Sequence, residues 1–147
     1  WAALLPQMLA ALGAVFALAG VGPVIGKLAA SFAISGPYAS VATYCLGMAL
    51  FTMVMGNAFA AFPVMTAGIG LPLVVAANGG DPVAMSAICM LAGFCGTLMT
   101  PMAANFNLVP AALLELQDRN AVIKAQIPTA LGLLALNIVL RALVVYR

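Results

Sequence analysis

The sequence predicts an all-α membrane protein, and three observations lead to that class. The chain has 147 residues, of which 66% are hydrophobic and only 5% are charged, whereas a soluble domain carries about 25% charged residues. Its mean hydropathy is +1.21. The apolar residues form long runs instead of alternating with polar ones, which favours transmembrane helices over the strands of a membrane β-barrel.

The composition also excludes several kinds of function. A net charge of +2 without a basic cluster speaks against nucleic-acid binding. The chain has no histidine, and it shows neither an acidic dyad nor a serine-nucleophile motif, so we expect no enzyme, no metal site and no cofactor. The three cysteines (Cys45, Cys89 and Cys95) lie in apolar runs and are expected to be core residues.

The first predicted element is a transmembrane helix over residues 2–27. Its apolar run is long enough to cross a hydrocarbon core of about 30 Å. Gly20, Gly22 and Pro23 weaken its end. Because the chain opens at Trp1, without Met and already inside an apolar stretch, we expect it to be part of a longer protein.

The second element, residues 38–77, is predicted to be a helical hairpin that turns at Gly56-Asn57. A Gly-Asn pair within an apolar run is a turn signal. Two interpretations remain open: two full spans that meet at an exposed turn, or two short helices that enter the membrane and return. Arms of about 15 residues are shorter than the roughly 20 needed to span, which favours the re-entrant hairpin.

The third element, residues 82–116, is predicted to be a broken transmembrane helix. Pro101 disfavours helix at Thr100 and frees a carbonyl four residues earlier. Asn107 is expected to be the N-cap of the helix that follows the break. Such a break persists in a membrane only where it is buried in protein or lines a polar cavity.

The last element is predicted to be a plain transmembrane helix over residues 124–146, with Asn137 as its central polar residue. Arg141 and Arg147 are expected to reach the membrane interface, and Tyr146 suits the aromatic belt. All four elements together form a single transmembrane unit, residues 1–147.

The loop charges predict an orientation for these elements. Lys27, Asp81 and the C-terminus share one side of the membrane, and the polar connection at residues 115–124 lies on the other. The first side carries three basic residues and the second carries two. The positive-inside rule then places the C-terminus in the cytoplasm.

The hairpin turn and the broken helix together predict a neutral, oxygen-rich site near the middle of the bilayer. Helix N-termini suit an anion, and helix C-termini suit Na⁺. No acidic residue lies deep in an apolar run, so Na⁺ coupling is favoured over a proton relay. The candidate ligand-binding residues are Gly56, Asn57, Thr97, Thr100, Pro101, Asn105 and Asn107.

Two stretches, residues 46–62 and 93–116, closely resemble a bacterial inner-membrane family of unknown function. The resemblance covers nearly the whole chain and corresponds to the C-terminal portion of that family. Its members look like one half of an ion-transporter-superfamily carrier, the class that includes divalent-anion and citrate/Na⁺ symporters. There the hairpin tip often reads Ser-Asn-Thr and the unwound helix Gly-Thr-Pro-Pro-Asn. Here Gly56-Asn57-Ala58 keeps the Asn, and Thr100-Pro101 with Asn105 matches in part.

The resemblance implies one repeat of an inverted-repeat transporter with alternating access. The second repeat would lie in the remainder of the protein or in a sister membrane subunit, and a homo-oligomer is also expected. A pyrrolidone-carboxylate peptidase is a common genetic neighbour of the family, which implies 5-oxoproline as the transported anion. The alternative is a structural or assembly subunit of a larger membrane complex, without a transport path of its own.

Overall fold

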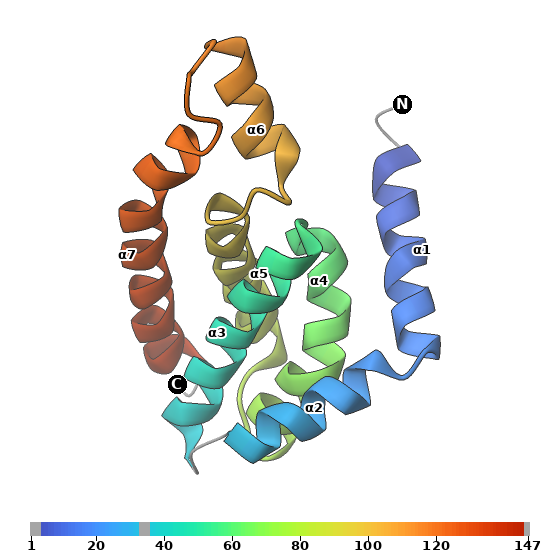
Figure 1. Ribbon diagram of the computed structural model, residues 1–147. Helices are drawn as coiled ribbons and strands as arrows, with labels where there is room; N and C mark the ends of the chain where they lie inside the picture. Colours follow the sequence, from blue (N-terminus) through green and yellow to red (C-terminus); the bar gives the residue numbers. More distant parts are fainter. Residues whose placement is uncertain (1–3, 33–35, 146–147) are drawn as a thin grey trace.

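The computed structural model describes residues 4–32 and 36–145, and every element in these ranges is a helix (Figure 1). Three helical stretches are long and apolar enough to cross a membrane, which supports the predicted class: Pro37–Met55, Ala58–Ala76 and Ala121–Arg141. The predicted start of the first helix at residue 2, and the predicted interfacial residues Tyr146 and Arg147, lie outside the described ranges. The elements in chain order are α1 (Leu4–Leu18), α2 (Val21–Phe32), α3 (Pro37–Met55), α4 (Ala58–Met65), the π-helix η1 (Thr66–Ala76), α5 (Pro82–Leu98), α6 (Ala104–Leu113) and α7 (Ala121–Val144).

The first predicted helix is divided into two shorter ones. Gly20 has a φ of +70° in the turn after α1, a left-handed conformation that glycine adopts without steric cost. The chain therefore changes direction there, and α2 runs at a steep angle to α1 (Figure 1). The prediction of one continuous helix is wrong, because the chain turns at Gly20, which was expected only to weaken the end of the helix.

A close backbone crossing holds α2 against η1. A Cβ atom on Gly26 would lie 2.5 Å from the carbonyl oxygen of Gly68, and one on Gly68 would lie 2.5 Å from the carbonyl oxygen of Gly22. Glycines four residues apart on a helix allow such an approach. The four-residue spacing of Gly22 and Gly26, which sequence analysis did not single out, is the pattern that permits this contact.

The predicted hairpin turns at the predicted residues. α3 ends at Met55, Gly56 adopts a φ of +71°, and Asn57 caps α4. The arms are longer than predicted, with 19 residues each. The second arm continues because the helix passes from α to π form at Thr66 and stays helical through Pro72. The arm-length argument for a re-entrant hairpin is therefore wrong, and the re-entrant form stays a prediction.

The third segment is interrupted between α5 and α6, at residues 99–103. Asp81 caps the start of α5, because its Oδ1 accepts a hydrogen bond from the N–H of Val83 at 2.9 Å. The next helix begins at Ala104, so Asn107 lies inside α6 and is not its N-cap. That part of the prediction is wrong by about one helical turn.

The core lies where the two arms of the hairpin pack against α5 and α7. The three cysteines are buried there, as predicted, beside side chains such as Met48 and Met85. The N–H of Asp81 donates to the carbonyl oxygen of Val145 at 3.1 Å, so α5 begins at the end of the bundle where α7 stops. The outer face of α7 exposes large apolar side chains, as expected for a lipid-facing surface: Leu131, Leu133, Leu136, Val139, Leu140 and Leu143.

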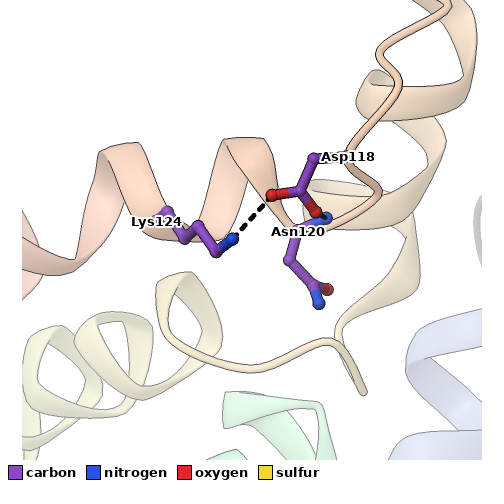
Figure 2. Close-up of polar contacts among 3 residues, drawn as sticks. All are labelled: Asp118, Asn120 and Lys124. Atoms are coloured by element: carbon purple, nitrogen blue, oxygen red, sulfur yellow. Dashed lines mark hydrogen bonds and ion pairs between the residues drawn. The ribbon is translucent and has the colours of Figure 1, made fainter.

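The polar connection between α6 and α7 carries an exposed ion pair (Figure 2). Lys124 Nζ lies 2.7 Å from Asp118 Oδ2, and Asp118 Oδ1 accepts a hydrogen bond from the N–H of Asn120 at 2.9 Å. Both contacts, that with Lys124 first, hold the pKa of the Asp118 carboxyl below its usual range. The start of α7 is thus fastened by local contacts at the surface.

Candidate functional site

The hairpin turn and the helix break meet in space. The hydroxyl of Thr100 donates a hydrogen bond of 2.7 Å to the carbonyl oxygen of Met53. A Cβ atom on Gly56 would lie 2.7 Å from the carbonyl oxygen of Met102. In Figure 1 the α3–α4 turn accordingly lies beside the loop that joins α5 to α6. We call this contact region, residues 52–57 and 97–107, the junction.

Asn107 completes the hydrogen bonding of the break. Pro101 has no N–H, so the carbonyl of Thr97, four residues earlier, lacks its helical partner. The side chain of Asn107 is fully buried, and its Nδ2 donates to the carbonyl oxygens of Thr97 at 2.8 Å and Thr100 at 2.6 Å. This amide therefore takes the place of the missing N–H and closes the end of α5.

Thr100 joins the two sides of the junction. Its hydroxyl accepts a hydrogen bond of 3.2 Å from the N–H of Met102 while it donates to Met53. The Met53 carbonyl belongs to the last turn of α3, where carbonyls lack helical partners. The hairpin and the broken helix thus satisfy each other's backbone groups.

Two buried oxygen atoms at the junction have no hydrogen-bond partner among the described residues, Asn107 Oδ1 and Thr52 Oγ1. Burial of an unpaired acceptor is costly. Either atom could contribute a ligand to a cation. Thr52 was not among the candidate residues selected from the sequence. Gly96 faces it: a Cβ atom there would lie 3.0 Å from the Cβ of Thr52.

The other predicted residues have more local roles. Asn57 Oδ1 accepts from the N–H groups of Phe59 at 2.9 Å and Ala60 at 3.4 Å, which is ordinary N-capping. The hydroxyl of Thr97 donates to a carbonyl of its own helix, at Phe94. Both remaining candidates, Pro101 and Asn105, are exposed. The junction therefore brings together Gly56, Thr100, Asn107 and the backbone of Thr97.

Four helix ends converge at the junction. α3 and α5 end there with carbonyl groups, and α4 and α6 begin there with N–H groups. The N-cap of α6 is Ala103, which provides no side-chain cap. Helix C-termini carry a partial negative charge and N-termini a partial positive one. The arrangement can accept a cation and an anion side by side.

Arg141 lies inside the bundle, and the prediction that it reaches the membrane interface is wrong. Its relative exposure is 0%. Nη1 lies 3.3 Å from the sulfur of Cys45, Nη2 donates to the carbonyl oxygen of Met85 at 2.9 Å, and the guanidinium carbon lies 4.2 Å from the centre of the Tyr44 ring. The four-residue spacing of Asn137 and Arg141 was a signal in the sequence, because it places both polar side chains on one face of the helix. Both are buried in the structure.

A groove of about 640 Å³ opens along α2, α3 and the second arm of the hairpin. Its lining is almost entirely apolar, with Leu46, Leu50 and Ile69 among the side chains. None of the seven predicted binding residues lines it. The groove and the junction are therefore separate features.

Comparison with known proteins gives one match. Neither the curated proteins nor the solved structures contain a match to this chain. One family model, described as "Protein of unknown function (DUF979)", matches residues 1–146. Since the match covers nearly the whole sequence, the chain belongs to this family of unknown function.

Proposed function

We propose that this chain is one half, or one subunit, of a secondary active transporter that moves a small organic anion together with Na⁺. The observation that carries this proposal is the junction, where a hairpin turn and a broken helix meet without any charged side chain. Intramembrane helix breaks are tolerated where they line a site. The expected anion is a carboxylate such as 5-oxoproline, and the expected second half is an inverted repeat or a sister membrane subunit.

The unpaired oxygens support the Na⁺ part of the proposal. Na⁺ binds carbonyl and hydroxyl oxygens at unwound helices. The junction offers Asn107 Oδ1 and Thr52 Oγ1, two buried acceptors without a partner among the described residues. The N-terminus of α6, which has no side-chain cap, would face the anion.

The position of the hairpin turn supports the re-entrant interpretation in spite of the arm lengths. The turn meets the chain at residues 99–103, and α6 continues beyond that level (Figure 1). A turn at that level would lie within the membrane rather than at its surface.

We place the protein in the bacterial inner membrane with its C-terminus in the cytoplasm. Reporter fusions at the C-terminus would test this orientation.

The direct test is transport by the full-length complex in proteoliposomes. Labelled 5-oxoproline, citrate and succinate would each be offered with and without a Na⁺ gradient. We expect saturable, Na⁺-dependent uptake of one of these acids. The absence of uptake by an intact complex would favour the alternative, a structural or assembly subunit without its own transport path.

A matched pair of variants tests the site. Thr52→Val removes an unpaired buried hydroxyl and no hydrogen bond, so the fold is expected to tolerate it. Thr97→Val removes a hydroxyl that is already bonded within its own helix. We expect Thr52→Val to raise the Na⁺ concentration needed for half-maximal uptake at least tenfold, and Thr97→Val to leave it nearly unchanged. Equal behaviour of the two variants would contradict the assignment.

A further inference from the structure

Arg141 is the one buried charged side chain among the residues that the structure describes. The other described charges are exposed: Lys27, Asp81, Glu115, Asp118, Arg119 and Lys124. The groups around the guanidinium are the thiols of Cys45 and Cys89, a backbone carbonyl and an aromatic ring. Within residues 4–32 and 36–145 its buried Nε has no hydrogen-bond partner, and the ion pair found there is elsewhere, between Lys124 and Asp118.

A buried charge with neutral neighbours acts at a distance. The guanidinium carries a permanent charge, and a protein interior screens it far less than water does. Removing such a charge from water is costly, whereas a neutral side chain could link the same three helices without that cost. An ionisable side chain inside a membrane segment is rare and is taken first as a candidate for a functional role.

The junction is close enough to the Arg141 charge for an electrostatic effect on ligand binding, but too far away for the guanidinium to touch the ligand. Cys45 precedes Met53 by eight residues on α3, and Met85 precedes Thr97 by twelve residues on α5, which correspond to about 12 Å and about 18 Å. At these separations, and with an effective dielectric constant of about 20, one charge changes the affinity for a singly charged ligand about five- to tenfold. Because the charge of Arg141 is positive, it favours the binding of anions and disfavours the binding of cations.

We propose that Arg141 is the fixed positive charge that gives the junction its preference for an anion, acting through space without touching the ligand. The inference rests on the proposed transport function and adds a residue that determines charge specificity. It also explains the absence of a buried carboxylate near Arg141 among the described residues, because a carboxylate there would cancel the field.

The test uses a pair of substitutions that differ only in charge, Cys45→Asp and Cys45→Asn. The aspartate would form an ion pair with Arg141, whose Nη1 already lies 3.3 Å from the Cys45 sulfur. It would therefore neutralise the charge of the guanidinium and leave its contacts with Met85 and Tyr44 in place. The asparagine has nearly the same shape and no charge. Equilibrium binding of labelled 5-oxoproline, citrate and succinate would be measured on the detergent-purified full-length complex, with thermal unfolding in parallel.

We expect Cys45→Asp to weaken binding of the singly charged 5-oxoproline about five- to tenfold relative to Cys45→Asn, and to weaken a multiply charged acid more. Na⁺ binding in the absence of the anion should change in the opposite direction. Thermal stability should be higher for Cys45→Asp, because the buried charge gains a counter-ion. A purely structural role would give the same gain in stability with equal anion binding in both variants, and that result would overturn the inference.

A second pair covers the case in which substitutions at Cys45 fail to fold. Arg141→Lys keeps the charge and Arg141→Gln removes it, and size-exclusion chromatography would select the folded complexes. Loss of anion affinity in Arg141→Gln alone supports the inference. If the wild-type complex binds none of the three acids, both the inference and the proposed function fail, whereas equal binding by charged and neutral variants removes only the inference.

Discussion

The two interruptions of the apolar helices are closed in different ways. At the hairpin turn, Asn57 accepts hydrogen bonds from N–H groups two and three residues ahead of it. At the break between α5 and α6, Asn107 donates to carbonyls ten and seven residues behind it. The first closure is local, and the second requires the chain to leave one helix and begin another before the amide can reach back.

The difference shows that two asparagines have opposite hydrogen-bonding roles at one junction. Asn57 satisfies the N–H groups that begin a helix, and its loss would leave groups that are partly accessible to solvent or ligand. Asn107 satisfies the carbonyls that end a helix, and it does so at 0% exposure. The buried closure should therefore matter more for stability than the local one.

The largest effect on stability is expected where the two interruptions touch, at Gly56. Gly56→Ala would impose a Cβ atom on a residue with a φ of +71° and bring it 2.7 Å from the Met102 carbonyl oxygen. Strain and overpacking together are expected to cost about 3 kcal/mol or more. Gly79→Ala is the control, because Gly79 has a φ of +68° with open space around it. Thermal unfolding in detergent should show a clearly smaller loss for the control, and equal losses would refute the close contact.

The next effect is expected at Asn107. Asn107→Leu would leave the carbonyls of Thr97 and Thr100 without their donor, at an expected cost of about 2–4 kcal/mol in unfolding free energy. Asn105→Leu makes the same exchange at an exposed position of the same helix and should change little. A comparison of the two melting temperatures checks the prediction, which fails if the exposed substitution is the more damaging.

A smaller loss is expected at Asn57. Asn57→Ala removes an N-cap, which typically costs about 1 kcal/mol. Asn57→Ser retains a capping oxygen and should recover most of the stability. The comparison between the closures would be wrong if Asn57→Ala destabilised the protein more than Asn107→Leu in the same thermal assay.

The smallest effect is expected at the exposed ion pair, which serves as the baseline for the two closures. The pKa of the Asp118 carboxyl is lowered in the folded state. The stabilisation of the folded state by the Asp118 ion pair is therefore fully present above the unfolded pKa of about 3.9. It is lost as the pH falls through the lower pKa of the folded state. Asp118→Asn should shift the melting temperature slightly at neutral pH and not at all at strongly acid pH. A shift that grew on acidification would contradict this sign.

Local signals in the sequence predicted the local features well. The Gly56-Asn57 turn was predicted at the correct residues, and Pro101 marked the break between α5 and α6. Both depend on residues whose backbone preferences act within one turn of helix. The buried cysteines followed from their apolar surroundings.

Features that depend on distant contacts could not be predicted in the same way. Asn107 was selected as a site residue, but its bonds to the end of α5 require α6 to fold back against the break. The guanidinium of Arg141 contacts residues 96 and 56 positions away in the sequence. Its position near the end of a helix therefore led to the wrong prediction that it reaches the membrane interface. The division of the first segment was indicated by Gly20, yet its direction is set by the crossing of Gly22 and Gly26 over Gly68.

The burial of Arg141 has a consequence for the order in which the protein is assembled during synthesis. Translation proceeds from the N-terminus, so α3 and α5 are complete before α7 leaves the ribosome. The thiol of Cys45, the carbonyl of Met85 and the ring of Tyr44 can then already be in place when α7 is inserted. Arg141, the side chain of α7 that is most costly to transfer into lipid, would thus enter a site that is already formed. It would not first be exposed to lipid and later be buried in protein.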